Sequence, residues 1–151
     1  MLLRTTALAL MMSTPALAVT LVDATVPDVI LSVARDFGTA SFDNLSNGDP
    51  GIKGRIDDVT YYINFAGYKD NRNCNSIQLE ATWEPTSDNT LAQMNTWNRT
   101  KMVGTASLNS KGNVALSMWV NLRNGVSAEN LHDSFEWWEF ILGDFKDFLS
   151  E

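Results

Sequence analysis

Apolar side chains near the C-terminus recur at the spacing of a helix. They follow one another at alternating intervals of four and three residues, which places them on one face. The positions in this stripe are Leu131, Phe135, Trp138, Leu142, Phe145 and Leu149. A second row, made of Trp137, Ile141 and Phe148, lies about a quarter-turn away. Ser127 precedes the helix and is suited to cap it. One apolar stripe is enough to dock a helix on a sheet, so the second row exceeds what the fold needs.

Two shorter helices are predicted earlier in the chain. A hydroxyl at Thr25, a proline two residues later and an acid in the first turn mark the start of one of them. Its apolar stripe is Val26, Ile30, Val33 and Phe37. The other begins at Asp88 or Asn89 and ends near Lys101. Its apolar stripe is Leu91, Met94 and Trp97.

Between the helices, apolar and polar residues alternate as in half-buried strands. Residues 52–56 and 59–65 form a predicted hairpin, residues 77–83 a strand, and residues 106–108 and 114–122 a second hairpin. Residues 40–45 are a further candidate. Trp119 faces away from the apolar side of its strand, which suggests that something covers it. We predict an α+β domain with an antiparallel sheet of about five strands and three helices, in the order α-βββ-α-ββ-α.

Residues 1–18 have the pattern of a signal peptide. The basic Arg4 precedes an apolar run, and small residues, Ala16 and Ala18, occupy the two positions that a signal peptidase recognises. The apolar run is too short to span a bilayer, so no membrane insertion is expected after cleavage behind Ala18. A buried N-terminal helix is the alternative. We expect a periplasmic or secreted protein whose single domain is residues 19–151.

Charge narrows the classes of function. Removing the signal peptide removes one cation, so the mature chain has 10 basic residues (11 minus 1) against 18 acidic ones, a charge of −8. Nucleic-acid binding requires a clustered basic face, which this chain lacks. Its acidity also opposes docking on an anionic membrane. Cys74 is the only cysteine. It is either buried or paired with a second chain, and burial is the commoner state of an unpaired cysteine.

No pattern indicates catalysis, a metal or a cofactor. His132 is the only histidine, whereas a metal site needs two or three converging ligands. Residues 46–49 have too few acids for a calcium loop. Asp57 and Asp58 are expected at the surface of a turn. The chain has neither a Gly-x-Ser-x-Gly elbow nor a loop that cradles phosphate. We therefore predict a protein that is not an enzyme, with no cofactor.

Five segments carry a resemblance to a known family. They are Ile56-Asp57-Asp58, residues 62–67, residues 74–78, Met94-Asn95-Thr96-Trp97-Asn98-Arg99 and residues 122–131. With these segments, the chain resembles the exported members of the YbjN family, also described as bacterial sensory transduction regulators, over about residues 24 to 149. The resemblance implies a fold like that of type III secretion chaperones, and no established chemistry. Relatives often have a cysteine after the glycine that matches Gly67. Tyr68 stands there instead, so a local bridge to Cys74 is impossible and any redox role taken from the family is in doubt.

The second predicted helix carries one candidate binding patch. Asn95, Trp97, Asn98 and Arg99 form a candidate site for a peptide or small ligand. The alternative is that the amides bond to nearby backbone, Trp97 packs, and Arg99 pairs with an acid. Buried amides are usually satisfied in that way, which favours the alternative.

The last helix carries the other candidate patch. Trp137, Phe140, Ile141 and Phe148 exceed what a small domain needs in its core, and exposed aromatic surface often marks a partner site. The alternative is an extended core.

From these patterns and the family resemblance we expect a non-enzymatic binding or chaperone-like module. We expect it to be a homodimer or to bind a protein partner, and to be linked to envelope stress or regulation. Two other hypotheses stay open. One is a small-ligand receptor or enzyme that uses Asn95, Asn98 and Arg99. The other is a structural envelope protein.

Overall fold

The computed structural model describes residues 21–45, 49–67 and 74–150. The predicted signal peptide and Tyr68 lie outside the described residues. The helices are α1 (Pro27–Asp36), α2 (Leu91–Thr100) and α3 (Ala128–Ser150). The strands are β1 (Thr39–Asn44), β2 (Pro50–Ile56), β3 (Val59–Ala66), β4 (Ser76–Trp83), β5 (Thr105–Leu108) and β6 (Val114–Asn121).

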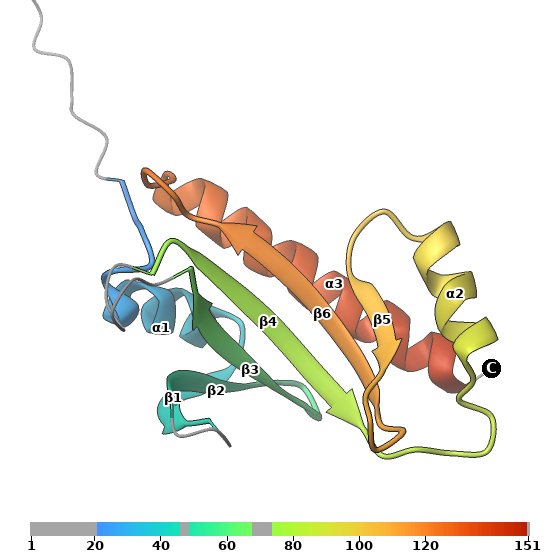
Figure 1. The fold of residues 1–151 in the computed structure, drawn as a ribbon. Coiled ribbons are helices and arrows are strands. Elements are labelled where there is room, and N and C mark those ends of the chain that lie inside the picture. The colour runs from blue at the N-terminus through green and yellow to red at the C-terminus, as the bar shows by residue number, and fades with distance from the viewer. Residues whose placement is uncertain (1–20, 46–48, 68–73, 151) are drawn as a thin grey trace, which may run out of the picture.

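The strands form one antiparallel sheet in the order β1-β2-β3-β4-β6-β5. Helices α1 and α3 lie on one face of this sheet, and α2 packs beside β5 at one end (Figure 1). The α+β class is therefore confirmed. The sheet has six strands rather than about five. The sixth strand is β1, which confirms the further candidate at residues 40–45 and pairs with β2 along its whole length although its side chains are mostly exposed. Without a buried face, β1 has no strong alternation by which to recognise it.

The two shorter helices differ in detail from their predicted patterns. The buried residues of α1 are Ile30, Leu31 and Ala34, whereas Val26 is exposed. Its N-cap residue is Val26 rather than Thr25, so no polar side chain caps its start, and the Thr25 hydroxyl donates to Asp23. Helix α2 begins at Leu91, later than predicted, because the Thr90 hydroxyl accepts a hydrogen bond from the Gln93 N–H at 3.2 Å.

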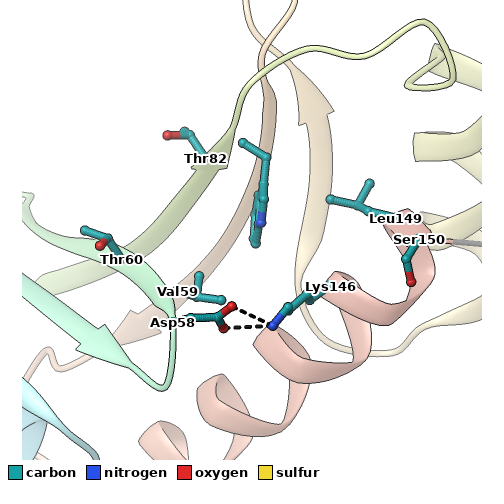
Figure 2. A pocket seen from close by; sticks show the side chains of 8 residues that line it. Asp58, Val59, Thr60, Thr82, Lys146, Leu149 and Ser150 are labelled. Carbon is teal, nitrogen blue, oxygen red and sulfur yellow. Dashed lines mark hydrogen bonds and ion pairs between the residues drawn. The ribbon is translucent and has the colours of Figure 1, made fainter.

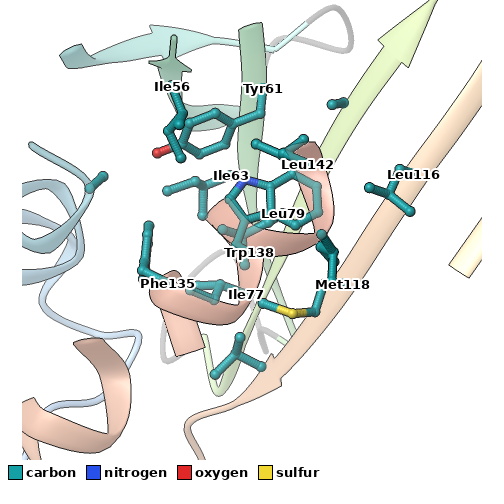
Figure 3. Packing of buried hydrophobic residues seen from close by; sticks show 14 of the residues in the cluster. Ile56, Tyr61, Ile63, Ile77, Leu79, Leu116, Met118, Phe135, Trp138 and Leu142 are labelled. Atoms are coloured by element: carbon teal, nitrogen blue, oxygen red, sulfur yellow. The ribbon is translucent and has the colours of Figure 1, made fainter. Parts of the chain in front are cut away.

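Helix α3 follows its predicted stripe closely. The Ser127 hydroxyl accepts from the Asn130 N–H at 3.1 Å and so caps the helix. Phe135 and Trp138 are fully buried against strand residues of the sheet (Figure 3). Burial of large side chains such as these stabilises a fold by about 1.5–3 kcal/mol each. This contact fixes α3 across the sheet and determines which side of the helix faces solvent.

The core contains one aromatic contact with two unpaired polar atoms. The Tyr61 and Trp138 rings meet edge to face at 5.8 Å. Neither the Tyr61 hydroxyl nor the Trp138 Nε1 has a hydrogen-bond partner among the described residues, although both atoms are buried. Gly54 of β2 leaves room for the tyrosine, because a Cβ there would lie 2.3 Å from the ring. Burial raises the pKa of Tyr61 to about 12.

The two edges of the sheet differ. The Leu45 N–H donates to the Asp49 carbonyl at 2.8 Å. This bond determines which residues of β1 turn their backbone groups toward β2 and which turn them away from the sheet. Alternate residues therefore point their backbone groups outward: Ala40, Phe42 and Asn44. Arg35 donates to the Ala40 carbonyl, and Asp43 accepts from the Asn44 N–H. Phe42 lies between these two residues. Among the three, it is the one whose backbone N–H and carbonyl both have no hydrogen bond to a described side chain. The opposite edge, β5, is covered by α2.

Candidate functional sites

Helix α2 holds the edge strand β5 through Asn98. The Asn98 Oδ1 accepts from the Ala106 N–H at 2.8 Å, and its Nδ2 donates to the Ala106 carbonyl at 2.9 Å. The side-chain amide thus takes the place of a further strand. Trp97, which is fully buried, donates from its Nε1 to the Gly104 carbonyl at 3.1 Å. These two residues of the predicted patch serve the backbone of the fold.

The other two residues of that patch face solvent. Asn95 and Arg99 line a hollow of about 460 Å³ together with Thr96 and the edge of Asn98. Neither Asn95 nor Arg99 forms a side-chain hydrogen bond or ion pair with a described residue. The structure therefore separates the predicted set into two residues bonded to backbone, of which Trp97 is buried, and two exposed residues without such bonds.

The predicted patch on α3 also divides in two. Ile141 is 3% exposed and Phe148 packs against the core, where its ring lies 5.4 Å from that of Trp97. Trp137 and Phe140 remain 46% and 63% exposed, with their rings edge to face at 6.1 Å. We refer to Trp137 and Phe140 as the aromatic pair. They line a hollow of about 350 Å³ together with Asp133 and Glu136.

An ion pair ties the β2–β3 turn to α3. The Lys146 Nζ donates to both carboxylate oxygens of Asp58 at 2.8 Å (Figure 2). This hydrogen bond holds the pKa of Asp58 below, and that of Lys146 above, its ordinary value. The pair stands at the rim of a hollow that also includes Trp83 and Leu149. Lys101 similarly joins the end of α2 to Asp144 of α3 at 2.6 Å.

The other face of the sheet carries a polar surface that the sequence patterns did not single out as a site. Asn64 donates to Gln78 at 3.4 Å, and Gln78 donates to Glu80 at 3.5 Å. Trp119 pairs with Gln78 in the sheet and is 60% exposed. Burial raises the pKa of the Glu80 carboxyl. Figure 1 shows that none of the three helices lies over this open face.

A group of cations and hydroxyls lies on the same open face, nearer the β1 edge. Lys53 and Arg55 of β2 line a hollow of about 480 Å³ with Thr39, Ser41 and Thr60. The alternation of β2 predicts that these two cations face solvent. Their hydroxyl neighbours depend on strand register, which the sequence pattern alone does not define.

The remaining candidates are isolated. Cys74 is half-buried and carries a free thiol, whose pKa burial raises. The His132 Nδ1 lies 3.3 Å from a Glu136 oxygen, and its ring lies 4.7 Å from that of Phe37. Within the described residues, no three side chains of His, Cys, Asp or Glu gather as a metal site would require. No helix in this part of the chain is both long enough and apolar enough to cross a bilayer.

The fold and these surfaces define a small α+β domain with exposed aromatic and polar patches. A family model described as "YbjN: Putative bacterial sensory transduction regulator" matches residues 27–151. The chain therefore belongs to the YbjN family, which confirms the family recognised from the sequence.

Among solved structures, the chain is similar to the one titled "Crystal structure of YbjN, a putative transcription regulator from E. coli". The two chains are 17% identical with a TM-score of 0.47, and the match covers 74% of this chain and 78% of that one. No curated protein matches.

Proposed function

We propose that this YbjN-family protein is an exported, non-enzymatic binding module whose protein partner docks on the aromatic pair of α3. The observation that carries the proposal is the exposure of Trp137 and Phe140 side by side, above a helix whose inner face already fills the core. Aromatic side chains are enriched at the energetic centres of protein interfaces. The signal-peptide pattern of residues 1–18 supports export.

The charges around the aromatic pair define the chemistry of its partner. Asp133 and Glu136 line the same hollow, and Glu139 is exposed on the same helix. A second copy that docked by the same face would bring these carboxylates together, which disfavours association. An apolar segment that carries Lys or Arg would instead meet complementary charge. The surface thus favours a cationic, amphipathic partner over self-association, and a homodimer is the competing outcome.

The test uses the mature chain, residues 19–151, with an amphipathic helical peptide of Lys and Leu as probe. We expect saturable binding, followed by fluorescence anisotropy of the labelled peptide. Trp137→Ala/Phe140→Ala is expected to weaken binding by at least about tenfold, as for interface hot spots. A matched peptide of Glu and Leu is expected not to bind.

Leu91→Ala/Met102→Ala is the matched control, because Leu91 and Met102 are 67% and 98% exposed elsewhere on the surface. Equal losses in the two double variants would defeat the proposal. Light scattering after size exclusion measures the oligomeric state. If the wild type is a dimer and Trp137→Ala/Phe140→Ala is a monomer, the partner of the aromatic pair is a second copy of the chain rather than a cationic segment.

A second candidate function is small-ligand binding at the hollow beside α2. The observation in its favour is that Asn95 and Arg99 are exposed there and unpaired among the described residues. Against it, Asn98 is engaged by Ala106 and unavailable to a ligand. A screen of small carboxylates by protein-observed NMR tests this function. Shifts that cluster at Asn95 and Arg99 and vanish in Arg99→Gln would support it.

A further inference from the structure

Two basic side chains on β2 are surrounded by hydroxyl groups. Residues two apart in a strand lie on the same face, so Lys53 and Arg55 project together. The strand register places Arg55 between Thr39 of β1 and Thr60 of β3. It places Lys53 between Ser41 of β1 and Tyr62 of β3. Neighbouring strands lie about 4.8 Å apart, so each cation has a hydroxyl within reach on either side. We refer to Lys53, Arg55 and these four hydroxyl residues as the basic array.

Neither cation of the array forms an ion pair with a described residue. The ion pairs of the described residues involve Lys101, His132 and Lys146, and neither Lys53 nor Arg55. Arg55 lowers the pKa of Asp58 through space, but both oxygens of Asp58 are bonded to Lys146.

Nearby carboxylates do not supply the missing charge. Asp43 lies at the next same-face position on β1, where its Oδ1 accepts from the Asn44 N–H at 2.8 Å. Glu80 lies in the row of Lys53 but with Tyr62 between them. An unpaired pair of cations in an acidic chain therefore stands open to an external anion.

We propose that the basic array is a binding site for a small, soluble, phosphate-bearing molecule. The hollow of about 480 Å³ lined by Lys53, Arg55, Thr39, Ser41 and Thr60 is large enough for a phosphate group with a small substituent. An Arg guanidinium binds phosphate through two parallel hydrogen bonds, Lys adds a point charge, and hydroxyls donate to the remaining oxygens. Donors on three neighbouring strands suit a tetrahedral oxyanion better than a planar carboxylate. The acidity of the whole chain opposes docking on an anionic lipid surface, so a soluble source of phosphate is favoured.

This site is independent of the aromatic pair. The basic array lies on the open face of the sheet, whereas Trp137 and Phe140 lie on the solvent side of α3, which covers the opposite face (Figure 1). A ligand at one surface leaves the other accessible. A negative result for one of these two proposals therefore does not contradict the other.

The experiment titrates the mature chain with inorganic phosphate in a low-salt buffer, followed by amide shifts in two-dimensional NMR. We expect saturable shifts centred on residues 39–41, 53–55 and 60–62. Sodium chloride at the same ionic strength, which screens charge without occupying a phosphate site, is expected not to reproduce them. Sodium acetate tests the preference for phosphate over carboxylate. Vesicles of phosphatidylglycerol, compared with phosphatidylcholine, test a lipid source.

Lys53→Gln/Arg55→Gln is expected to weaken phosphate binding by at least about tenfold, since it removes both charge-assisted contacts. Lys111→Gln/Arg123→Gln is the matched control, because it removes the same charge from exposed positions away from the array. Arg55→Lys is expected to retain partial binding. Thermal melting of each variant establishes that it is folded.

Three results would overturn the proposal. The first is a wild-type titration without saturation, or one that chloride or acetate reproduces. The second is an equal loss in the matched control, which would show only a general effect of net charge. The third is binding to phosphatidylglycerol vesicles alone, which would assign the array to a lipid surface rather than a soluble molecule.

Discussion

The side chain of Asn98 binds both backbone groups of Ala106. The two hydrogen bonds, at 2.8 and 2.9 Å, occupy the outward-facing N–H and carbonyl of a strand at the edge of the sheet. An amide is the neutral side chain that offers a donor and an acceptor at the right separation for this task. Of the two interpretations of this asparagine, ligand recognition and backbone bonding, the favoured one, backbone bonding, is confirmed: Asn98 closes the β5 edge.

Asn98→Ala is therefore expected to lower the free energy of unfolding by about 2 kcal/mol, because each hydrogen bond contributes roughly 1 kcal/mol. Asn95→Ala on the same helix is the control and is expected to change it by less than about 0.5 kcal/mol. Urea denaturation followed by circular dichroism measures both. Equal effects of the two substitutions would contradict the structural role of Asn98.

Tyr61→Phe is expected to raise the free energy of unfolding by about 1 kcal/mol. The buried hydroxyl has no hydrogen-bond partner in the described part of the chain, so its removal avoids the cost of its desolvation. The pKa of Tyr61 is raised to about 12, so the folded state favours the protonated phenol. The resulting stability is present below the unfolded pKa of about 10 and is lost as the pH rises toward 12. The variant is expected to lose less stability in that range than the wild type does. A variant that is destabilised at pH 7 would mean that the hydroxyl is bonded after all.

Glu80→Gln is expected to stabilise the protein at pH 7. Burial raises the pKa of Glu80, so the folded state binds its proton more tightly than the unfolded state does. The stability linked to this carboxyl is fully present below the unfolded pKa of 4.5 and is lost as the pH rises through the folded value. The difference in melting temperature between variant and wild type should therefore shrink in acid. Glu84→Gln, at an exposed position just after β4, is the control and should leave the melting temperature unchanged.

Asp58→Asn is expected to lower the melting temperature by a small amount that decreases in high salt, because the pair it breaks is exposed. The pKa of Asp58 is lowered, so its contribution is present above pH 3.8 and is lost as the pH falls through the folded value below that. The pKa of Lys146 is raised, so its contribution is present below pH 10.5 and is lost as the pH rises above that. A melting temperature that responds equally to Asp57→Asn would show that only the net charge of the turn matters.

Helix α3 was predictable because its apolar spacing is set by contacts along one continuous segment, from Leu131 to Phe145. Strand β1 gave a weaker signal because neither of its faces is well buried, so its pairing with β2 leaves little trace in residue type. The sequence pattern could not predict which residues of the second row on α3 would be buried. Phe148 is covered by Trp97 of another helix, a contact between segments far apart in the chain.

Backbone bonding by the amides of α2 was the favoured interpretation, but the partner of Asn98 and the neighbours in the basic array lay beyond the sequence pattern, for the same physical reason. The neighbours of Lys53 and Arg55 follow from the register of three strands, and a shift of one residue between β1 and β2 would replace both β1 hydroxyls beside them. Asn98 meets Ala106 only because the chain between them turns α2 back along β5. Side-chain chemistry is visible in the sequence, whereas the pairing of distant segments is fixed by the assembled sheet.

The unequal borders of the sheet limit how copies of this chain can stack. With one border blocked at Ala106, a strand from a neighbouring molecule can add only beside Phe42. Two molecules that paired through their β1 edges would have only β5 edges left, so no third molecule could add a strand. The side chain of Asn98 thus opposes a route by which stacked sheets lengthen into fibres.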